Sequence, residues 1–178
     1  MPAYVAFLRA VNVRPRWVKM DQLRALLQEH GFGDVQTHIQ SGNVRVTTPT
    51  RTAAKVEATL SELISSTFGF EVPVIARTPV ELRDLATAVD ALPSPLGAAA
   101  RLYVVFVRGP LGDTTVKQVN AWSEPGERAL VVGRDIALWI DRGFHEARFP
   151  TAPLWRSTPA VTTARDIKVV RALVEKWC

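Results

Sequence analysis

Cysteine is almost absent from this 178-residue chain, whose single cysteine, Cys178, is its last residue. No intrachain disulfide can form, which is typical of a reducing compartment, so we expect a cytoplasmic protein. Only three histidines are present, and none is paired with another metal-binding side chain at the spacing of a zinc site. We therefore expect neither a metal ion nor another cofactor.

Long hydrophobic runs and catalytic motifs are also missing. No apolar stretch approaches the roughly 20 residues that span a bilayer, and Arg9 interrupts the first apolar run, so we expect no signal peptide and no membrane partner. The glycine-rich motifs of P-loops and dinucleotide-binding folds are absent, as is the Gly-x-Ser-x-Gly turn of hydrolases. No catalytic residue can be named, and the sequence leaves open whether the protein is an enzyme.

The charge is basic but evenly distributed. The formal net charge is +5, and residues 1–78 carry 9 basic and 6 acidic side chains, whereas residues 79–178 carry 13 and 11. Nucleic-acid-binding domains usually cluster their cations on one face, and no block of five like charges occurs here. The pattern disfavours nucleic acid as the main partner, although it leaves RNA binding as an alternative.

The first half alternates the periodicities of strands and helices. A two-residue alternation or a short apolar run predicts strands, and a three- to four-residue spacing predicts helices. The predicted strands are 4–8, 35–40, 44–46 and 72–76, and the predicted helices are 23–30 and 56–64. Gly42-Asn43 is typical of a two-residue hairpin turn, and Pro73 favours a sheet edge for the fourth strand. The resulting β-α-β-β-α-β order is that of the ferredoxin-like fold.

A second set of elements follows a helix and a linker. Thr78-Pro79-Val80-Glu81 is typical of a capped helix start, and residues 92–100 predict a linker. Beyond the linker we expect a strand, a helix, a hairpin and a final helix starting at Thr162 or Thr163. These are 102–108, 114–122, 128–132 with 135–140, and 163–177. The chain is thus divided into a ferredoxin-like subdomain (1–78), a helix and linker (79–100), and a second ferredoxin-like subdomain (101–178).

The fold that we predict is α+β, with two ferredoxin-like halves whose antiparallel sheets pack against each other. The second half lacks an obvious last strand, and no sequence repeat is visible between the halves. The central strands 4–8 and 102–107 are apolar on both faces, whereas a sheet with one open face should alternate. Because two sheets packed face to face would cover these second faces, we expect Phe7, Val105 and Val107 to be buried.

Three segments of the first 50 residues are distinctive: Leu8-Arg9-Ala10-Val11-Asn12-Val13, Val18-Lys19-Met20 and Ile39-Gln40-Ser41-Gly42-Asn43-Val44. They resemble the N-terminal signature of a bacterial family known as domain of unknown function 1697. The resemblance covers essentially the whole chain and implies two ferredoxin-like halves, without an established activity. The chain departs from the family pattern at Arg14-Pro15, where a Gly-Gly turn is usual, and at His38, where Tyr is usual. It also departs after Arg165, where Asp166-Ile167-Lys168 replaces an Asn-Trp-Asn run.

A candidate ligand site follows from the predicted topology. Strands 1 and 3 of a ferredoxin-like sheet are antiparallel neighbours, so the loop after strand 1 and the turn before strand 3 lie at one end. That loop leads into a helix N-terminus, which favours anions, and Arg14 and Arg16 add positive charge. Arg165 would contribute from the start of the last helix. The candidate ligand-binding residues are Arg9, Asn12, Lys19, Gln40, Ser41, Asn43 and Arg165. The alternative is an ordinary turn with solvated cations.

Three classes of function are compatible with the sequence. The first, which we favour, is a small-molecule binding protein or enzyme with an anionic ligand such as a nucleotide or phosphorylated metabolite. The second is an RNA-binding module, because paired ferredoxin-like units resemble RNA-recognition motifs. However, the third strand, residues 43–47, carries none of the aromatic side chains that those motifs place there. The third is a structural or self-associating protein without a ligand. The oligomeric state cannot be predicted.

Overall fold

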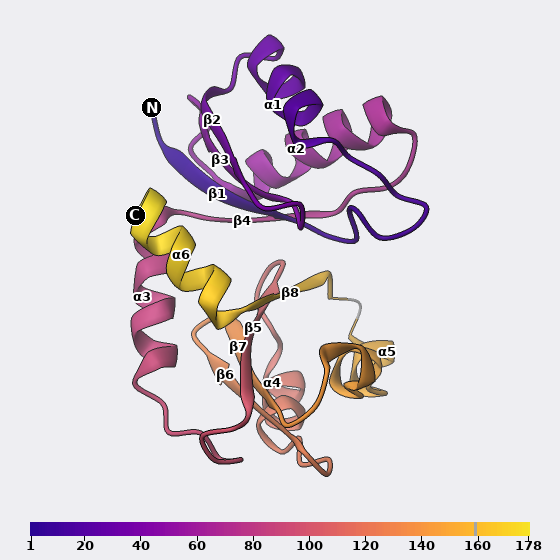
Figure 1. The fold of residues 1–178 in the computed structure, drawn as a ribbon, viewed down its shortest axis with the longest axis vertical. Helices are drawn as coiled ribbons and strands as arrows, with labels where there is room; N and C mark the ends of the chain where they lie inside the picture. The colour runs from indigo at the N-terminus through magenta and orange to yellow at the C-terminus, as the bar shows by residue number, and fades with distance from the viewer. Residues whose placement is uncertain (159) are drawn as a thin grey trace. The chain divides into compact units, whose positions relative to one another are not determined.

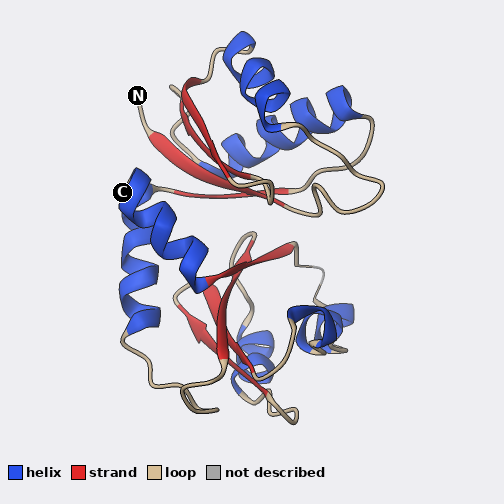
Figure 2. Ribbon diagram, viewed as in Figure 1, coloured by secondary structure: helices blue, strands red, loops and turns tan. Residues whose placement is uncertain are grey.

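The computed structural model describes residues 1–158 and 160–178 and divides into two compact units (Figure 1). Unit 1 contains Met1–Leu82 together with Leu173–Cys178, and unit 2 contains Arg83–Ala172. Each unit has one four-stranded antiparallel sheet and helices packed on it (Figure 2). The division falls within the helices α3 (Pro79–Asp90) and α6 (Ile167–Trp177), so each of these helices contributes residues to both units.

Unit 1 has the predicted β-α-β-β-α-β order. Its strands are arranged β2-β3-β1-β4, and every neighbouring pair is antiparallel. This is the ferredoxin-like arrangement, and β4 lies at an edge, as Pro73 predicts. The elements are β1 (Ala3–Leu8), α1 (Met20–Glu29), β2 (Gly33–His38), β3 (Asn43–Thr47), α2 (Ala53–Phe68) and β4 (Val74–Arg77).

The helices α1 and α2 cover one face of the unit 1 sheet (Figure 1). The core on this face is a cluster of buried apolar side chains that includes Tyr4, Ala6, Leu8, Leu23, Leu27, Leu60 and Ile64. Leu23 and Leu27 are four residues apart, as are Leu60 and Ile64, and this spacing places each pair on one face of its helix. The periodicity of the sequence therefore fixes which helix faces turn toward the sheet.

Unit 2 repeats this sheet with the order β6-β7-β5-β8. The elements are β5 (Arg101–Val107), α4 (Asp113–Asn120), β6 (Glu127–Val132), β7 (Asp135–Ile140) and β8 (Thr162–Asp166). Where unit 1 has α2, unit 2 has two 3-10 helices, η1 (Phe144–Glu146) and η2 (Phe149–Thr151), and a one-turn helix, α5 (Leu154–Ser157). Phe149 and Leu154 of this segment are buried in one cluster with Tyr103 and Val105 of β5. A short irregular segment thus does the covering that a long helix does in unit 1.

The strand β8 corrects the prediction for the end of the chain. The sequence predicts a helix from Thr162 or Thr163 and no last strand, but these residues begin β8, and α6 begins only at Ile167. Thr163 and Arg165 are buried while their neighbours in the strand are less so, which is the alternation of an edge strand. The helix begins after the strand because Oδ1 of Asp166 accepts a hydrogen bond from the backbone N–H of Lys168 at 2.8 Å.

The strand registers reveal a sequence repeat that inspection of the sequence missed. Val5 pairs with Arg77 in unit 1, and Val104 pairs with Arg165 in unit 2. In both units Nη1 of the arginine donates to the carbonyl of the preceding alanine, at 2.7 and 2.8 Å. With the registers aligned, residues 4–9 (Tyr-Val-Ala-Phe-Leu-Arg) correspond to residues 103–108 (Tyr-Val-Val-Phe-Val-Arg). The halves therefore share both a fold and a Tyr-Val-x-Phe-x-Arg motif.

The predicted burial of the central strands is confirmed for the residues that were singled out. Phe7, Val105 and Val107 are all buried. Val105 and Val107 belong to the core cluster of unit 2, together with Val119 of α4. The packing of one sheet against the other stays a prediction, as do the domain boundaries at residues 78 and 101.

A buried carboxylate fastens the irregular segment of unit 2 to its sheet. Glu127, at the start of β6, has no exposed surface. Its Oε1 accepts a hydrogen bond from the backbone N–H of Arg148 at 2.6 Å, and its Oε2 accepts from the backbone N–H of Phe149 at 3.0 Å and from Nε1 of Trp122 at 3.3 Å. The Phe149 ring in turn packs edge-on against Trp122 and Trp155. This carboxylate therefore positions a hydrophobic anchor.

Candidate functional site

The loop after β1 and the turn before β3 meet at one end of unit 1, as the topology predicts. The backbone N–H of Leu8 donates to the carbonyl of Gly42 at 2.8 Å, which joins the end of β1 to the turn. Nδ2 of Asn12 donates to the carbonyl of Gln40 at 2.5 Å. Two of the predicted site residues are thus in direct contact.

The side chain of Asn12 also organises its own loop. Its Oδ1 accepts a hydrogen bond from the backbone N–H of Val18 at 2.9 Å, and its backbone N–H donates to the carbonyl of Arg16 at 2.7 Å. The φ angle of Asn12 is 56°, a left-handed conformation that asparagine tolerates better than most residues. Both ends of the Asn12 amide are therefore occupied, and its role at this end is to hold the loop and the turn together.

A cavity of about 370 Å³ lies at this junction. It is lined by Asn12, Trp17, Val18, Lys19 and Gln40, so it contains three of the predicted site residues. The Lys19 backbone forms the N-cap of α1, and its side chain is exposed and makes no capping hydrogen bond. The side-chain amide of Gln40 is exposed and has no partner within residues 1–158 and 160–178. A cation, an amide and a helix N-terminus therefore converge on one cavity.

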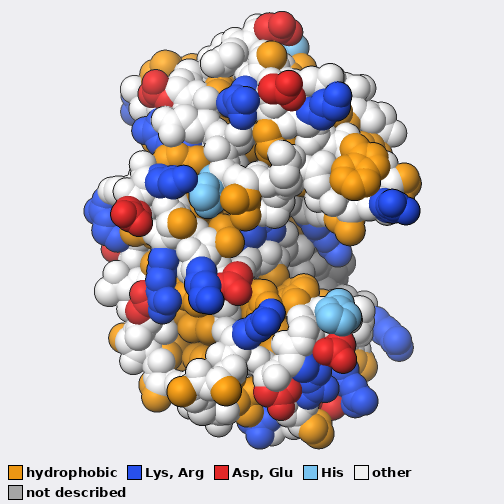
Figure 3. Space-filling model, viewed as in Figure 1, with side chains coloured by type: hydrophobic (Ala, Val, Ile, Leu, Met, Phe, Trp, Pro, Cys, Tyr) orange, Lys and Arg blue, Asp and Glu red, His pale blue; other side chains and the backbone are white. Residues whose placement is uncertain are grey.

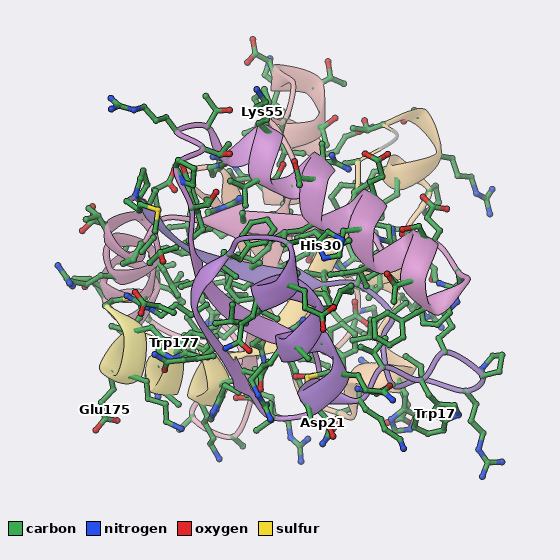
Figure 4. All side chains as sticks on the ribbon, turned by 90° about the horizontal axis from the view of Figure 1, so that it is seen from above. Trp17, Asp21, His30, Lys55, Glu175 and Trp177 are labelled. Carbon is green, nitrogen blue, oxygen red and sulfur yellow. The ribbon has the colours of Figure 1, made fainter. Side chains whose placement is uncertain are left out.

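Trp17 is the member of this site that inspection of the sequence missed. Its side chain is 60% exposed, whereas Trp139 and Trp177 are buried. Figure 4 shows Trp17 on the loop before α1, projecting away from the helices. Val13 and Ile39, in the same loop and turn, are exposed as well. A tryptophan in a basic loop, outside any periodic apolar pattern, was the signal that could have identified it.

Positive charge is concentrated on the loop that borders the cavity. Arg9, Arg14 and Arg16 are exposed on the same loop as Lys19, and hydrophobic and basic side chains lie side by side on this part of unit 1 (Figure 3). The nearest acidic residue in sequence is Asp21 in the first turn of α1, whose Oδ1 accepts a hydrogen bond from the backbone N–H of Gln22 at 2.8 Å. The field at this end therefore favours an anion.

Ser41 and Asn43 lie next to the cavity without lining it. The turn has four residues, 39–42, because His38 pairs with Asn43, so the predicted two-residue turn at Gly42-Asn43 is wrong. Asn43 opens β3 and is fully buried. Its Nδ2 donates to the carbonyl of His38 at 3.0 Å and to Oγ of Ser41 at 3.1 Å. This amide closes the turn that carries Gln40.

Arg165, the remaining predicted residue, lies in unit 2 on β8 and not at the start of the last helix. Its guanidinium donates to Oγ1 of Thr163 at 2.9 Å as well as to the carbonyl of Ala164. Burial lowers the pKa of Arg165 to about 10, so the side chain stays charged at neutral pH. Its register position is that of Arg77 in unit 1, which makes it part of the repeat.

Within residues 1–158 and 160–178, no group of three His, Cys, Asp or Glu side chains is placed to hold a metal ion. None of the helices in this described part of the chain is long and apolar enough to cross a membrane.

The comparisons with known proteins agree with the sequence resemblance. The family described as protein of unknown function (DUF1697) matches residues 1–136. The chain belongs to this family. No curated protein matches the chain. Among solved structures, the conserved bacterial protein SP0830 from Streptococcus pneumoniae is similar, with a TM-score of 0.70 and 20% sequence identity over 98% of this chain and 97% of that one. At that identity the likeness establishes the fold, and the function must come from the site.

Proposed function

We propose that unit 1 binds a nucleotide or a similar phosphorylated ligand with a flat ring, in the cavity beside Trp17. The observation that carries this proposal is the exposed Trp17 indole beside the Lys19 cation in a cavity of about 370 Å³. This volume lies at the lower end of the range for small-molecule sites, roughly 300–1,000 Å³. A cavity of this size fits a single nucleotide better than a length of single-stranded RNA.

Each part of such a ligand has a matching group in the cavity. The Trp17 indole offers a face on which a base can stack, and stacking is worth about 1–3 kcal/mol per base. Lys19 lines the cavity and suits a phosphate, because its side chain is a cation and it caps the N-terminus of α1, which carries partial positive charge. The Gln40 amide offers one acceptor and two donors to the edge of a base. Arg9 does not line the cavity, but its charge adds to the positive electrostatic field at this end of unit 1.

The same geometry supports a small molecule more than RNA. RNA-recognition motifs stack bases on aromatic side chains that are exposed on the sheet. In unit 1 the aromatic residues of the sheet are Tyr4 and Phe7 of β1, and both are buried. Val44 and Val46 of β3 are buried too. Because the exposed aromatic side chain is on a loop, we place RNA second. The single cysteine supports action in the cytoplasm.

The test is a thermal-shift and calorimetric titration of the full chain with AMP, GMP, ribose phosphate and adenosine. A ligand that binds the folded state raises Tm by mass action. We expect both nucleotides to bind more tightly than ribose phosphate, which lacks the ring, and adenosine, which lacks the charge. Trp17→Ala and Lys19→Ala should each weaken nucleotide binding about tenfold.

The matched control is Lys55→Ala, because Lys55 is an exposed lysine of the same unit that lies on α2, away from Trp17 (Figure 4). It removes the same charge and should leave nucleotide affinity unchanged. If nucleotides bind the Trp17 and Lys19 variants as tightly as the wild type, the site lies elsewhere. If a short single-stranded RNA binds much more tightly than any mononucleotide, the RNA-binding alternative is correct.

A further inference from the structure

Unit 2 contains a larger cavity, of about 620 Å³, whose lining residues all belong to that unit. It is bounded by the end of α3, the loop from α3 to β5, the start of α6 and the strand β7. Its apolar lining includes Leu92 and Leu102, which are half-buried, and Trp139 and Ile167, which keep only a small exposed surface. Figure 3 shows hydrophobic side chains at the base of a hollow in this region, with basic and acidic side chains along its edge.

Two of the charged groups that line this cavity are already paired with each other. Nη2 and Nε of Arg171 donate to Oδ1 of Asp90 at 2.6 and 3.1 Å, so α6 is clamped to the end of α3. Asp166 is engaged through Oδ1, which accepts the backbone N–H of Lys168. These contacts fix the edge of the cavity.

Two cations in the lining are left without such partners. The side chains of Arg101, at the start of β5, and Lys168, in the first turn of α6, make no hydrogen bond or ion pair within the described residues. The charged lining comprises Asp90, Arg101, Asp166, Lys168 and Arg171, so three cations face two carboxylates. The cavity therefore has one excess positive charge above an apolar base.

We propose that unit 2 binds an organic monoanion with a hydrophobic body, such as an aryl carboxylate. Arg101 and Lys168 would hold the carboxylate, because arginine offers two parallel N–H donors and lysine a compact charge. Leu92, Leu102 and the exposed edge of Ile167 would contact the hydrophobic body. The excess of one positive charge matches one carboxylate and not a diphosphate. This second site is independent of the nucleotide site that we propose in unit 1.

The experiment is a titration of the full-length, isotope-labelled protein followed by two-dimensional amide NMR. The probes are phenylpropionate, indole acetate and octanoate, with phenylpropionamide as the uncharged match for the first. We expect at least one carboxylate to bind and to shift the amide signals of Ala98, Ala99 and Lys168, which lie at the cavity.

Three variants separate this site from general attraction of anions. Arg101→Ala should weaken carboxylate binding about tenfold, because it removes a charged hydrogen-bond donor. Asp90→Asn should strengthen it about threefold, because it removes one carboxylate from the lining and releases the guanidinium of Arg171. Lys117→Ala, which removes an exposed cation of α4 outside the cavity, should change nothing.

The outcomes against the proposal are equally specific. If phenylpropionamide binds as tightly as phenylpropionate, the cavity takes a hydrophobic ligand without selecting its charge, and the proposal is wrong. It is also wrong if Arg101→Ala and Lys117→Ala weaken binding equally. The same conclusion follows if none of the three carboxylates shifts the cavity signals at millimolar concentration.

Discussion

Removal of the Glu127 carboxylate should destabilise unit 2 strongly. Glu127→Ala leaves three N–H donors without their acceptor, two from the backbone of the segment after η1 and one from the Trp122 indole. Each buried donor without a partner costs about 1–3 kcal/mol. The Phe149 hydrogen bond is buried, whereas the Arg148 and Trp122 bonds are only part-buried, so water can replace some of what is lost. We therefore expect a loss of about 3–5 kcal/mol in the free energy of unfolding.

Two further variants calibrate this prediction. Glu127→Gln keeps one acceptor oxygen but turns an NH₂ group toward a donor, so we expect about half the loss, roughly 1.5–2.5 kcal/mol. Glu124→Gln is the control, because Glu124 pairs with Arg148 at the surface, where their side chains are 35% and 70% exposed. Such exposed pairs contribute about 0–1 kcal/mol.

The assay is urea-induced unfolding at neutral pH, together with hydrogen exchange at the amides of Arg148 and Phe149. The exchange of these two amides should accelerate in Glu127→Ala before global unfolding. If Glu127→Ala loses no more stability than Glu124→Gln, the carboxylate does not fasten the segment, and the reasoning from its hydrogen bonds is wrong.

Two more predictions concern unit 1. Gly42→Ala should lower the free energy of unfolding by about 2–4 kcal/mol, because φ is 78° and the new Cβ would lie 2.6 Å from Cγ2 of Val11. Gly31→Ala, with φ of 82° and no atom within 4 Å of the new Cβ, should lower it by only about 1 kcal/mol. Equal losses of stability in the two variants, measured by thermal unfolding, would contradict the steric explanation. Burial first, and the nearby charge of Lys176 second, lower the pKa of His38 below its ordinary 6.5. The folded state therefore binds fewer protons than the unfolded state, and the stability that this group contributes above pH 6.5 is lost as the pH falls through its lowered pKa. As the pH falls from 7 to 5, the free energy of unfolding, measured with urea, should therefore decrease less in His38→Gln than in the wild type. An identical pH dependence in the two proteins would show that His38 does not contribute to it.

Most of the fold could be predicted because its elements carry clear periodicities. The order of unit 1, the edge position of β4 and the capped start of α3 all follow from local patterns. Oε2 of Glu81 accepts the backbone N–H of Thr78 at 2.7 Å, and Oγ1 of Thr78 accepts the backbone N–H of Glu81 at 3.2 Å, which is the predicted capping box. Signals of this kind depend on neighbouring residues alone.

The errors arose where a distant contact decides between two local possibilities. A pair of threonines before an amphipathic run is equally typical of a helix cap and of an edge strand, and pairing with β5 selects the strand for Thr162 and Thr163. The turn before β3 was misplaced because Ile39 continues a strand alternation, yet its φ is 51°, a conformation that β-branched residues rarely adopt. The hydrogen bonds of buried Asn43 hold that turn.

The candidate site was predicted in part for the same reason. Topology alone brings Asn12 and Gln40 to one end, where they are hydrogen-bonded and line one cavity with Lys19. Trp17 has no periodic partners, so its exposure depends on the path of a loop that the sequence does not specify. The cavity of unit 2 is assembled from α3, β5, β7 and α6, whose side-by-side placement requires the structure.

Unit 1 is built from two separate segments of the chain, and this division affects the order of folding during synthesis. Its last segment, Leu173–Cys178, is translated after all of unit 2, yet Nε1 of Trp177 donates to Oε1 of Gln36 on β2 at 3.0 Å. The edge strand β2 therefore lacks this contact while the rest of unit 1 leaves the ribosome. Domains usually fold as units from the N-terminus onward, but here the first unit is completed by the final residues of the chain. A nascent chain that ends at Ala172 would therefore lack the contact of Trp177 with β2.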